Sequence, residues 1–414
     1  MVKRYLPPVA AFVVCALLAV WVLTSPFWQT VMKVSTVMRI VHDEYVDAES
    51  VSYERLRSAA IEGIMASLDT HSRYMPREDF ERFEESTQQR YVGIGVEIER
   101  LRERVTVITV FDGGPASEAG LLPGDQIIAV GEEDAADWSV GDVAQRLRGP
   151  SGERVSVTLT RPLSGEVLEV GLTRAPVRLA SVRDERLDDE GFGYIALRQF
   201  GDRTPGEVRE AAERFAQKGA RGLVIDLRDN PGGLLHAAKA VADVFLPRGQ
   251  LIVSMEGRRK RDRVEFRAEE PAMLEGVPLV VILNESSASG AEIVAGALQD
   301  ALRATVVGAT SYGKGSVQSV YSFRAGDALR QTTARYLLPG GRSIDEVGIE
   351  PDVVVEFSEE ERAELILQER HSSILGAEAF EEIFGWPPDR TDKPLQTALD
   401  ILREQVEERA RQNV

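Results

Sequence analysis

The sequence is poor in the residues on which thiol and imidazole chemistry depend. Its 414 residues include one cysteine and four histidines. A single cysteine excludes an internal disulfide framework and a cysteine-rich zinc site. The histidines are scattered and form no His-Glu-x-x-His pair; they are His42, His71, His236 and His371. We therefore expect no metal site and no cofactor.

Positive charge is also scarce beside negative charge. The chain has 67 Asp and Glu against 49 Lys and Arg, which gives a formal net charge of -18. A nucleic-acid binder needs basic residues that neutralise phosphates, so nucleic acid is not an expected partner. With 43% hydrophobic and 28% charged residues, the composition is typical of a globular protein. The length allows two to four domains of roughly 100–200 residues each.

One long uncharged stretch stands near the N-terminus. Lys3 and Arg4 precede an uncharged segment, residues 5–31, whose apolar centre is Val9–Leu23. Basic residues beside an apolar segment orient it with the N-terminus in the cytoplasm, and about 20 apolar residues span a bilayer. A cleaved signal peptide is the alternative, although no clean small-x-small cleavage site follows. We interpret residues 1–28 as a membrane anchor or signal segment, favour the uncleaved anchor, and expect an extracytoplasmic (periplasmic) chain tethered to the inner membrane.

Hydrophobic periodicity divides the remaining chain into four parts. Residues 29–88 have apolar residues three and four apart and predict a helical N-terminal region. Residues 89–175 alternate in short strands with one small helix, and residues 358–414 return to helix. Between them, residues 176–357 alternate apolar strands with helices, which indicates a sheet covered on both faces. The predicted fold class is multidomain α+β, with a mixed sheet in an α/β core.

The module at residues 89–175 resembles a PDZ domain. Gly93-Ile94-Gly95 resembles the carboxylate-binding loop of that family, and Ala119-Gly120-Leu121 with Pro123-Gly124-Asp125 resembles its characteristic turn. Successive glycines let backbone N–H groups converge on a carboxylate, and an adjacent strand edge adds the ligand as an extra strand. The resemblance implies a substrate-binding loop made by Gly93, Ile94, Gly95 and Val96.

A serine-rich segment leaves a buried strand and enters a helix at residues 284–293. A helix N-terminus presents unpaired N–H groups and partial positive charge. Both features suit a serine nucleophile and the oxyanion that develops beside it. The alternative is a plain helix cap, because serine is a preferred capping residue.

A second segment, residues 308–318, nearly matches a phosphate-binding P-loop. It departs at Gly315, where Ser or Thr is needed for the metal, and a strand rather than a helix is expected behind it. Lys314 instead stands between two glycines at a strand entry. Desolvation disfavours a charged lysine, and a neutral amine can take the proton of a serine hydroxyl. Gln318, four residues later on an extended strand, shares a face with Lys314 and would orient its amine.

Together the two segments resemble the carboxyl-terminal processing peptidases, which are tail-specific serine proteases with a Ser-Lys dyad and an embedded PDZ domain. In that family the nucleophile lies five residues after the Asn of its motif and twenty-five before the lysine. Both counts reach Ser289, from Asn284 and from Lys314. The resemblance implies that Ser289 is the nucleophile, Lys314 the general base and Gln318 the residue that positions it.

The family also has an oxyanion loop, which residues 226–233 resemble. The resemblance implies an oxyanion hole made by the N–H of Gly232 or Gly233 together with that of Gly290. It further implies protein substrates with exposed apolar C-termini and a homo-oligomer, and it leaves an adaptor lipoprotein open as a partner. Which glycine donates stays open at this point.

The sequence departs from the family at Gly290 and Ala291, where alanine and serine are common. Glycine makes the turn more flexible, so a catalytically inactive PDZ scaffold with a decayed protease fold is the alternative function. A Ser-His-Asp hydrolase that uses His236 ranks lower, because the sequence contains no Gly-x-Ser-x-Gly elbow.

Overall fold

The computed structural model describes residues 17, 21, 24–87, 90–101, 103–162 and 164–412. The chain divides into two compact units, one of residues 1–77 with 319–332 and one of residues 78–318 with 333–414. Most of the predicted anchor lies outside the described residues. Among the residues that are described, none of the helices has the length and apolar character needed to cross a bilayer.

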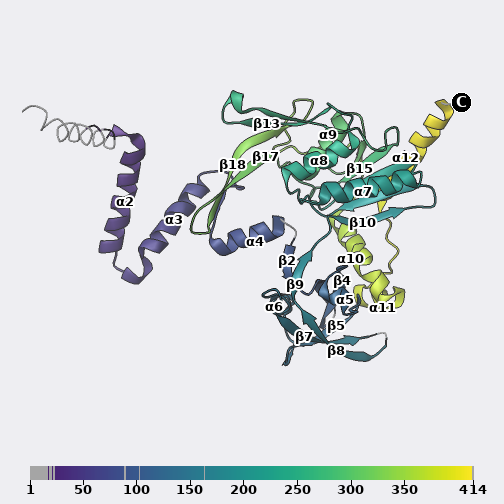
Figure 1. The fold of residues 1–414 in the computed structure, drawn as a ribbon, viewed down its shortest axis with the longest axis horizontal. Coiled ribbons are helices and arrows are strands. Elements are labelled where there is room, and N and C mark those ends of the chain that lie inside the picture. Colours follow the sequence, from purple (N-terminus) through teal and green to yellow (C-terminus); the bar gives the residue numbers. More distant parts are fainter. Residues whose placement is uncertain are drawn as a thin grey trace, which may run out of the picture. The chain divides into compact units, whose positions relative to one another are not determined.

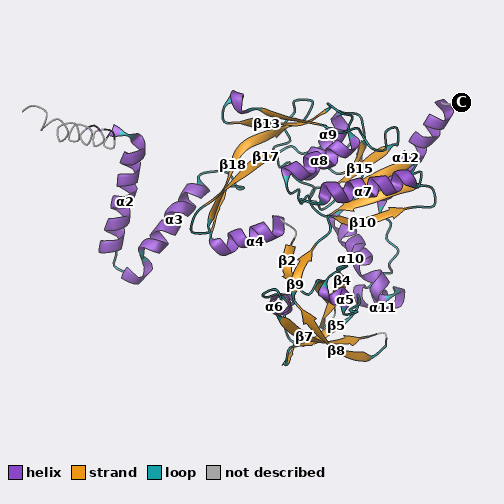
Figure 2. Ribbon diagram, viewed as in Figure 1, coloured by secondary structure: helices purple, strands orange, loops and turns teal. Residues whose placement is uncertain are grey.

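The first unit contains the two predicted amphipathic helices (Figures 1 and 2). They are α2, Pro26–Glu44, and α3, Tyr53–Ala66, with the short 3-10 turn η2, Ala48–Ser50, between them. Helix α3 begins where the Ser52 hydroxyl accepts the Arg55 N–H at 3.3 Å, as an N-cap does. After α3, strand β1, Arg73–Met75, pairs antiparallel with the first residues of β18, Ala328–Leu337.

The second unit begins at residue 78, one residue into α4, Arg77–Thr87, and then holds the module that resembled a PDZ domain. Strands β2, Arg90–Gly93, and β9, Ala175–Arg178, pair antiparallel where the chain enters and leaves the module. The sheet between them has the order β3-β4-β5-β7-β8, with β6, Glu133–Asp134, beside β5. The other elements are β3 Val96–Leu101, β4 Arg104–Val110, α5 Pro115–Glu118, β5 Gln126–Val130, α6 Val140–Leu147, β7 Arg154–Arg161 and β8 Glu166–Thr173.

The larger sheet of this unit runs β10-β11-β12-β15-β16-β19. Its strands are β10 Val182–Leu187, β11 Phe192–Leu197, β12 Gly222–Asp226, β15 Leu279–Leu283, β16 Thr305–Gly308 and β19 Val353–Val354. All pairs are parallel except β10 with β11. Helices α7 Thr204–Gln217, α8 Leu235–Phe245 and α9 Gly290–Asp300 pack on one face in the main core, and α12 Lys393–Gln412 packs on the other. Both faces are covered, as the apolar strands predicted.

A second sheet and two further helices complete the unit. Strands β13 Leu251–Gly257 and β14 Val264–Arg267, the first residues of β17, Ser316–Ser322, and the later part of β18 belong to one sheet, with the 3-10 turn η3, Lys260–Asp262, between β13 and β14. The tail is helical as predicted, with α10 Glu359–Leu375 and α11 Ala377–Phe384 before α12. Helix α12 packs into the core, because Ala398 and Leu402 are fully buried against the large sheet.

Strands β10 and β18 were not predicted from the sequence. Most residues of β10, Val-Arg-Asp-Glu-Arg-Leu, are only half-buried at the edge of the sheet, and most of those of β18 are half-buried as well. Edge strands lack the continuous apolar run that marks a central parallel strand, so periodicity gives little signal for them.

One buried ion pair ties the characteristic turn of the PDZ module to the end of β7. Asp125 is fully buried and accepts two hydrogen bonds from the Arg161 guanidinium, at 2.8 and 3.0 Å. The same carboxylate accepts the Leu122 N–H at 2.9 Å. We expect Asp125→Asn to destabilise the module by about 2 kcal/mol, because an amide group offers one acceptor where two are used. Faster hydrogen exchange in β4, β5 and β7 would report it, whereas the exposed Asp112→Asn should leave exchange unchanged.

Candidate active site

The segments singled out in the sequence follow neighbouring parallel strands of the large sheet. Residues 227–234 follow β12, residues 284–289 follow β15, and residues 309–315 follow β16. The carboxyl ends of adjacent parallel strands meet at one edge, which is where ligands bind in open α/β sheets. The sheet therefore brings the serine segment, the lysine segment and the expected oxyanion loop to the same edge.

Ser289 stands directly before α9 in a backbone conformation that non-glycine residues rarely adopt. Its φ is +52° and its ψ is -109°. Such a conformation costs on the order of 1–3 kcal/mol and persists only where surrounding contacts enforce it. Here the Ser289 N–H donates to Glu292 Oε2 at 2.7 Å. The half-buried serine is thus the N-cap of α9, held in a sharp strand-to-helix turn whose φ and ψ differ from the extended values usual for an N-cap.

Glu292, one turn into α9, joins the serine turn to the lysine loop. Its side chain is fully buried. Oε2 accepts the N–H of Ser289 and that of Lys314, the latter at 2.9 Å. Oε1 accepts the Ser311 hydroxyl at 2.6 Å and the Gly313 N–H at 2.7 Å. The backbones of Ser289 and Lys314 therefore meet on one carboxylate oxygen.

Burial raises the pKa of the Glu292 carboxyl, and the four donors oppose that shift without cancelling it. A buried carboxylate is costly unless its lone pairs are filled. Four hydrogen bonds to one side chain meet that requirement. The sequence analysis did not single out Glu292, although its position three residues after the serine is that of a capping-box glutamate.

Lys314 is half-buried in the loop before β17, not in the strand itself. The glycines beside it let other backbone segments approach closely. A Cβ on Gly315 would lie 2.5 Å from the Asp345 nitrogen, and one on Gly313 would lie 2.9 Å from the Val347 nitrogen. Gly313 also has a φ of +88°. The Gly-Lys-Gly sequence thus serves tight packing of the loop, as expected for a turn that partly buries a lysine.

Gln318 lies in β17 and is also half-buried. Its Nε2 donates to the Ser316 hydroxyl at 2.9 Å. Because β17 begins at Ser316, the two-residue repeat of an extended strand places Ser316 and Gln318 on one face. Lys314 precedes the strand and does not share this face. The proposed role of Gln318 stays a prediction.

The loop of residues 227–234 packs directly against the serine turn. A Cβ on Gly232 would lie 2.7 Å from Ser289 Cβ and 2.8 Å from the Gly290 nitrogen, so only glycine fits there. The Gly232 N–H donates to Asn230 Oδ1 at 2.9 Å. Gly232 is therefore engaged with a side chain in this structure, which favours Gly233 over Gly232 as the loop's donor to a substrate oxygen.

Three polar side chains to which the sequence pattern assigned no structural role hold this loop and the serine turn together. Asn230 is fully buried, and its Nδ2 donates to the Leu197 carbonyl at 2.9 Å. The main-chain carbonyl of Asn230 accepts the Ala288 N–H at 2.9 Å. The Ser287 hydroxyl donates to the Leu227 carbonyl at 2.8 Å. Asn284 exchanges two hydrogen bonds with Asp229, at 3.0 and 3.1 Å. Short polar residues after a strand are typical of turns, so the sequence alone did not indicate that they connect the two segments.

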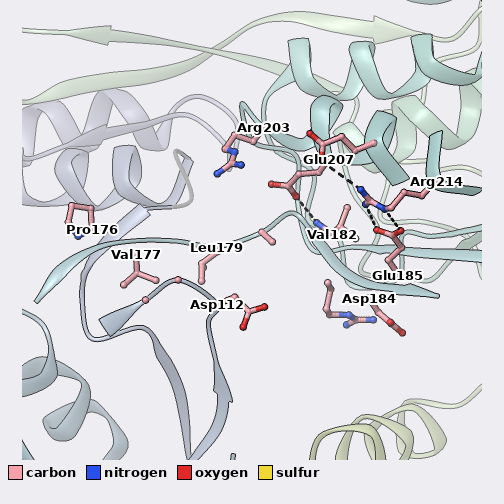
Figure 3. Close-up of a pocket in the computed structure, with 15 residues that line it drawn as sticks. Asp112, Pro176, Val177, Leu179, Val182, Asp184, Glu185, Arg203, Glu207 and Arg214 are labelled. Atoms are coloured by element: carbon pink, nitrogen blue, oxygen red, sulfur yellow. Dashed lines mark hydrogen bonds and ion pairs between the residues drawn. The ribbon is translucent and has the colours of Figure 1, made fainter. Parts of the chain in front are cut away.

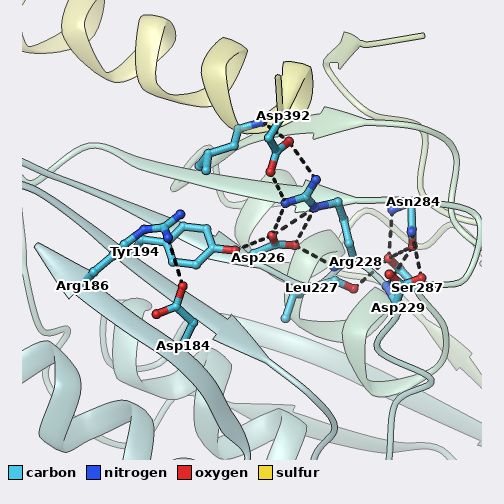
Figure 4. A network of polar contacts seen from close by, with 11 residues as sticks. Asp184, Arg186, Tyr194, Asp226, Leu227, Arg228, Asp229, Asn284, Ser287 and Asp392 are labelled. Atoms are coloured by element: carbon cyan, nitrogen blue, oxygen red, sulfur yellow. Dashed lines mark hydrogen bonds and ion pairs between the residues drawn. The ribbon is translucent and has the colours of Figure 1, made fainter. Parts of the chain in front are cut away.

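A buried charge network lies beneath the loop (Figure 4). Arg228 binds Asp226 on one side and Asp392, which precedes α12, on the other. The Tyr194 hydroxyl donates to Asp226 at 2.7 Å. Burial alone would raise the pKa of Asp226, but the Arg228 guanidinium holds it below its usual range. Burial raises the pKa of Tyr194, so it stays a donor. The network fixes the start of the loop on the sheet and the start of α12.

The expected substrate-binding residues of the PDZ module line a cavity of about 350 Å³ between β3 and α6. Gly93, Ile94, Gly95 and Val96 all contribute to it. Gly95 has a φ of +86°, which explains glycine at that point. The structure thus brings these four residues together at one cavity, whose volume lies within the range of ligand-binding pockets.

Another cavity, of about 590 Å³, lies where the chain leaves the PDZ module (Figure 3). Glu207 of α7 accepts the N–H groups of Ser181 and Val182, at 2.7 and 3.0 Å, and Arg214 pairs with Glu185. The lining includes neither Ser289 nor Lys314, and its charges are already paired in part. We assign this cavity to the linker rather than to the active site.

Comparisons with known proteins agree with this arrangement. The model of "Peptidase family S41" matches residues 191–355, and that of "PDZ domain" matches residues 106–161. The chain is 37% identical over 307 residues to the "Carboxy-terminal-processing protease" of Bartonella bacilliformis, which covers 73% of this chain and 70% of that protein. It is 31% identical over 325 residues to a "Probable CtpA-like serine protease" of Staphylococcus aureus, covering 78% of this chain and 64% of the relative.

A solved structure supports the fold. The putative S41 protease from Bacteroides fragilis superposes with a TM-score of 0.54 at 17% identity, covering 89% of this chain and 97% of that one. Both family matches fall inside the ranges expected from the sequence, residues 176–357 and 89–175.

The position of Glu292 predicts an unusual acid limb in the pH dependence of peptide-bond hydrolysis. Because burial raises its pKa, the folded chain binds this proton more tightly than the unfolded chain. Glu292 therefore contributes most to the free energy of unfolding below its unfolded-state pKa, and this contribution falls as the pH rises through the folded-state pKa. The rate of peptide-bond hydrolysis should show the opposite trend. It should fall as the pH is lowered, at a pH above the usual glutamate pKa of about 4.3, while the fold persists.

Glu292→Gln tests this role. An amide presents one acceptor and one donor group to four donors, so Ser289 and Lys314 should separate, and kcat/KM should fall about 100-fold, as small misplacements do. The exposed Glu285→Gln is the matched control and should keep both rate and acid limb. Circular dichroism over the same pH range checks the fold; activity loss that coincides with unfolding would contradict the assignment.

Proposed function

The chain belongs to peptidase family S41, and from that membership we propose that it is a serine endopeptidase in which Ser289 and Lys314 form a catalytic dyad. The observation that carries the proposal is the shared carboxylate of Glu292, which accepts the N–H groups of both residues. If Glu292 only capped the helix, its Oε2 would accept the Ser289 N–H and would not also need the N–H of Lys314. The strained φ of Ser289 supports the same assignment, because such strain gathers at functional sites.

The proposed reaction is acyl transfer through a covalent intermediate. Ser289 Oγ attacks the scissile carbonyl carbon while the neutral Lys314 amine takes its proton. The N–H groups of Gly290 and Gly233 receive the oxyanion. The tetrahedral intermediate then collapses, the C–N bond breaks, and Lys314 returns the proton to the leaving amine. Water, deprotonated by Lys314, hydrolyses the acyl-enzyme and restores Ser289. In this proposal Gln318 orients the lysine amine.

The PDZ groove supplies the substrate class. An extended peptide would add to the edge of β3, with its terminal carboxylate at residues 93–95 and apolar side chains in the cavity. We propose protein substrates with exposed apolar C-termini. The proposal includes an extracytoplasmic location, with residues 1–28 as the tether, a homo-oligomer and room for an adaptor lipoprotein.

The alternative of an inactive scaffold rested on Gly290 and Ala291. A Cβ at position 290 would lie 3.1 Å from the Phe200 ring and 3.2 Å from Ala238 Cβ. Glycine therefore suits the close packing of this turn. Ala291 is fully buried, so no hydroxyl there would compete with Ser289. The geometry favours the enzyme over the scaffold.

Replacement of either dyad residue should abolish cleavage. Ser289→Ala and Lys314→Ala should each lower kcat for a tailed model protein by at least about 10³-fold, since residues that act as a unit fail together. Mass spectrometry of the products measures the rate. The exposed Ser286→Ala and Lys218→Ala serve as matched controls. A dyad variant that folds and retains full activity would refute the mechanism.

The groove predicts a requirement for a free terminal carboxylate. Converting the substrate's C-terminus to a carboxamide should raise KM about 10- to 100-fold, which corresponds to the loss of charge-assisted hydrogen bonds. Matched peptides that differ only in this group provide the measurement. Equal KM values for the acid and the amide would exclude tail recognition by the PDZ module.

A further inference from the structure

The PDZ groove is not closed by the PDZ module alone. Its cavity is also lined by Leu179, which follows β9, and by Arg198, which follows β11 of the large sheet. A residue of the protease core therefore reaches the wall of the groove in which the substrate's C-terminus is proposed to bind.

The connection between β9 and β10 brings Arg198 to the end of the groove that holds the carboxylate-binding loop. A Cβ on Gly95 would lie 3.5 Å from Val177 Cγ2 in β9. From Val177 the chain continues through Leu179 to Ser181, whose carbonyl accepts the Arg198 N–H at 2.8 Å. The Glu207 carboxylate holds the same stretch by accepting the N–H of Ser181 and that of Val182, the second of which is drawn in Figure 3.

The backbone of the loop is arranged to receive an anion. The carbonyl of Ile94 accepts the Ala116 N–H at 2.8 Å, and that of Gly95 accepts the Phe111 N–H at 3.0 Å. In a trans peptide the C=O and the following N–H point in opposite directions. The N–H groups of Gly95 and Val96 therefore point away from α5 and β4. Within the described residues β3 is the last strand of its sheet, so its other edge faces the cavity.

Arg198 carries a donor that is left unpaired within the described part of the chain. Its Nε is buried and has no hydrogen-bond partner there. The other cation in the lining, Arg148, stands over the Tyr91 ring with 5.4 Å between its Cζ and the ring centroid. Among the described residues of the lining, Glu97 is the only acidic one. A buried guanidinium N–H without an acceptor is unfavourable, so an anionic ligand in the groove would be stabilised.

We propose that Arg198 forms the second half of the carboxylate site, so that a substrate's free α-carboxylate is held between the loop N–H groups of the PDZ module and the guanidinium of the protease core. This inference rests on the proposed function and adds the core residue that selects the ligand. The bound carboxylate then links the two parts of the protein through one ion pair.

Phe200, two residues after Arg198, contacts the oxyanion loop. Phe200 donates its N–H to the Gly232 carbonyl at 2.8 Å and accepts the Leu234 N–H at 2.8 Å. Phe200 and Gly233 also form a parallel bridge. A ligand that fixes Arg198 thus restrains the segment on which Gly232 and Gly233 rest. Arg198 would act as a specificity-determining residue for the tail and a positioning residue for the loop.

Peptide binding to the full chain carrying Ser289→Ala tests the proposal without turnover. Two fluorescein-labelled peptides with the same apolar C-terminal sequence, one ending in a free carboxylate and one in a carboxamide, are titrated and followed by anisotropy. The parent should bind the acid about 10- to 100-fold more tightly than the amide. Arg198→Gln should reduce that ratio at least about 10-fold, by weakening binding of the acid alone. Arg198→Lys should restore part of it, because lysine keeps the charge but not the fork geometry.

The matched control is Arg221→Gln, whose guanidinium binds the Glu190 carbonyl far from the groove; it should leave the ratio unchanged. If the parent itself does not distinguish acid from amide, the proposed tail recognition fails. If the parent distinguishes them and Arg198→Gln does so equally well, the proposed function stands and the role of Arg198 is refuted. Equal loss of affinity for both peptides also refutes it, because it would show a general effect on the groove. Hydrogen exchange of β3 and β11 in each variant confirms that both strands remain folded.

Discussion

The four hydrogen bonds to the buried Glu292 carboxylate are the interaction on which the rest of the site depends. They bind the turn of Ser289, the loop of Lys314 and the Ser311 hydroxyl to one side chain of α9. A buried carboxylate demands that its lone pairs be filled, and here only the two active-site segments fill them. The Glu292 carboxylate thus holds the backbones of Ser289 and Lys314 close together, although the two residues lie twenty-five positions apart in the sequence.

Close backbone approach is the second constraint, and it explains the glycines. Gly232 contacts the serine turn, and Gly315 contacts the segment at Asp345, at distances that leave no room for a Cβ. The buried pair of Asp226 and Arg228 holds the start of the oxyanion loop in place. Ser289 can then remain at a positive φ, because the segments on both sides of it are fixed.

Much of the fold could be predicted because apolar strands and amphipathic helices have distinct periods. The central strands β11, β12 and β15 and the helices α7, α8 and α9 lie within residues 176–357, where alternating strands and helices were predicted, and the short strands of the PDZ module lie within residues 89–175. The edge strand β10 and the half-buried β18 were missed, since neither is a continuous apolar run. Placing Lys314 on the strand of Gln318 was wrong, because β17 begins two residues after the lysine. Its two flanking glycines favour a loop.

The sequence by itself contains few cysteines and histidines. For that reason a lysine was the expected general base. The sequence also determined the spacing of Asn284, Ser289 and Lys314, because chemistry of this kind needs given residue types at given intervals. Only the tertiary structure decided that Glu292 joins serine to lysine, that Gly232 is engaged by Asn230, and that Arg198 reaches the PDZ groove. The physical reason is that these contacts connect different strands and loops. Which side chains meet there depends on sheet order and packing, and no local pattern in the sequence records either.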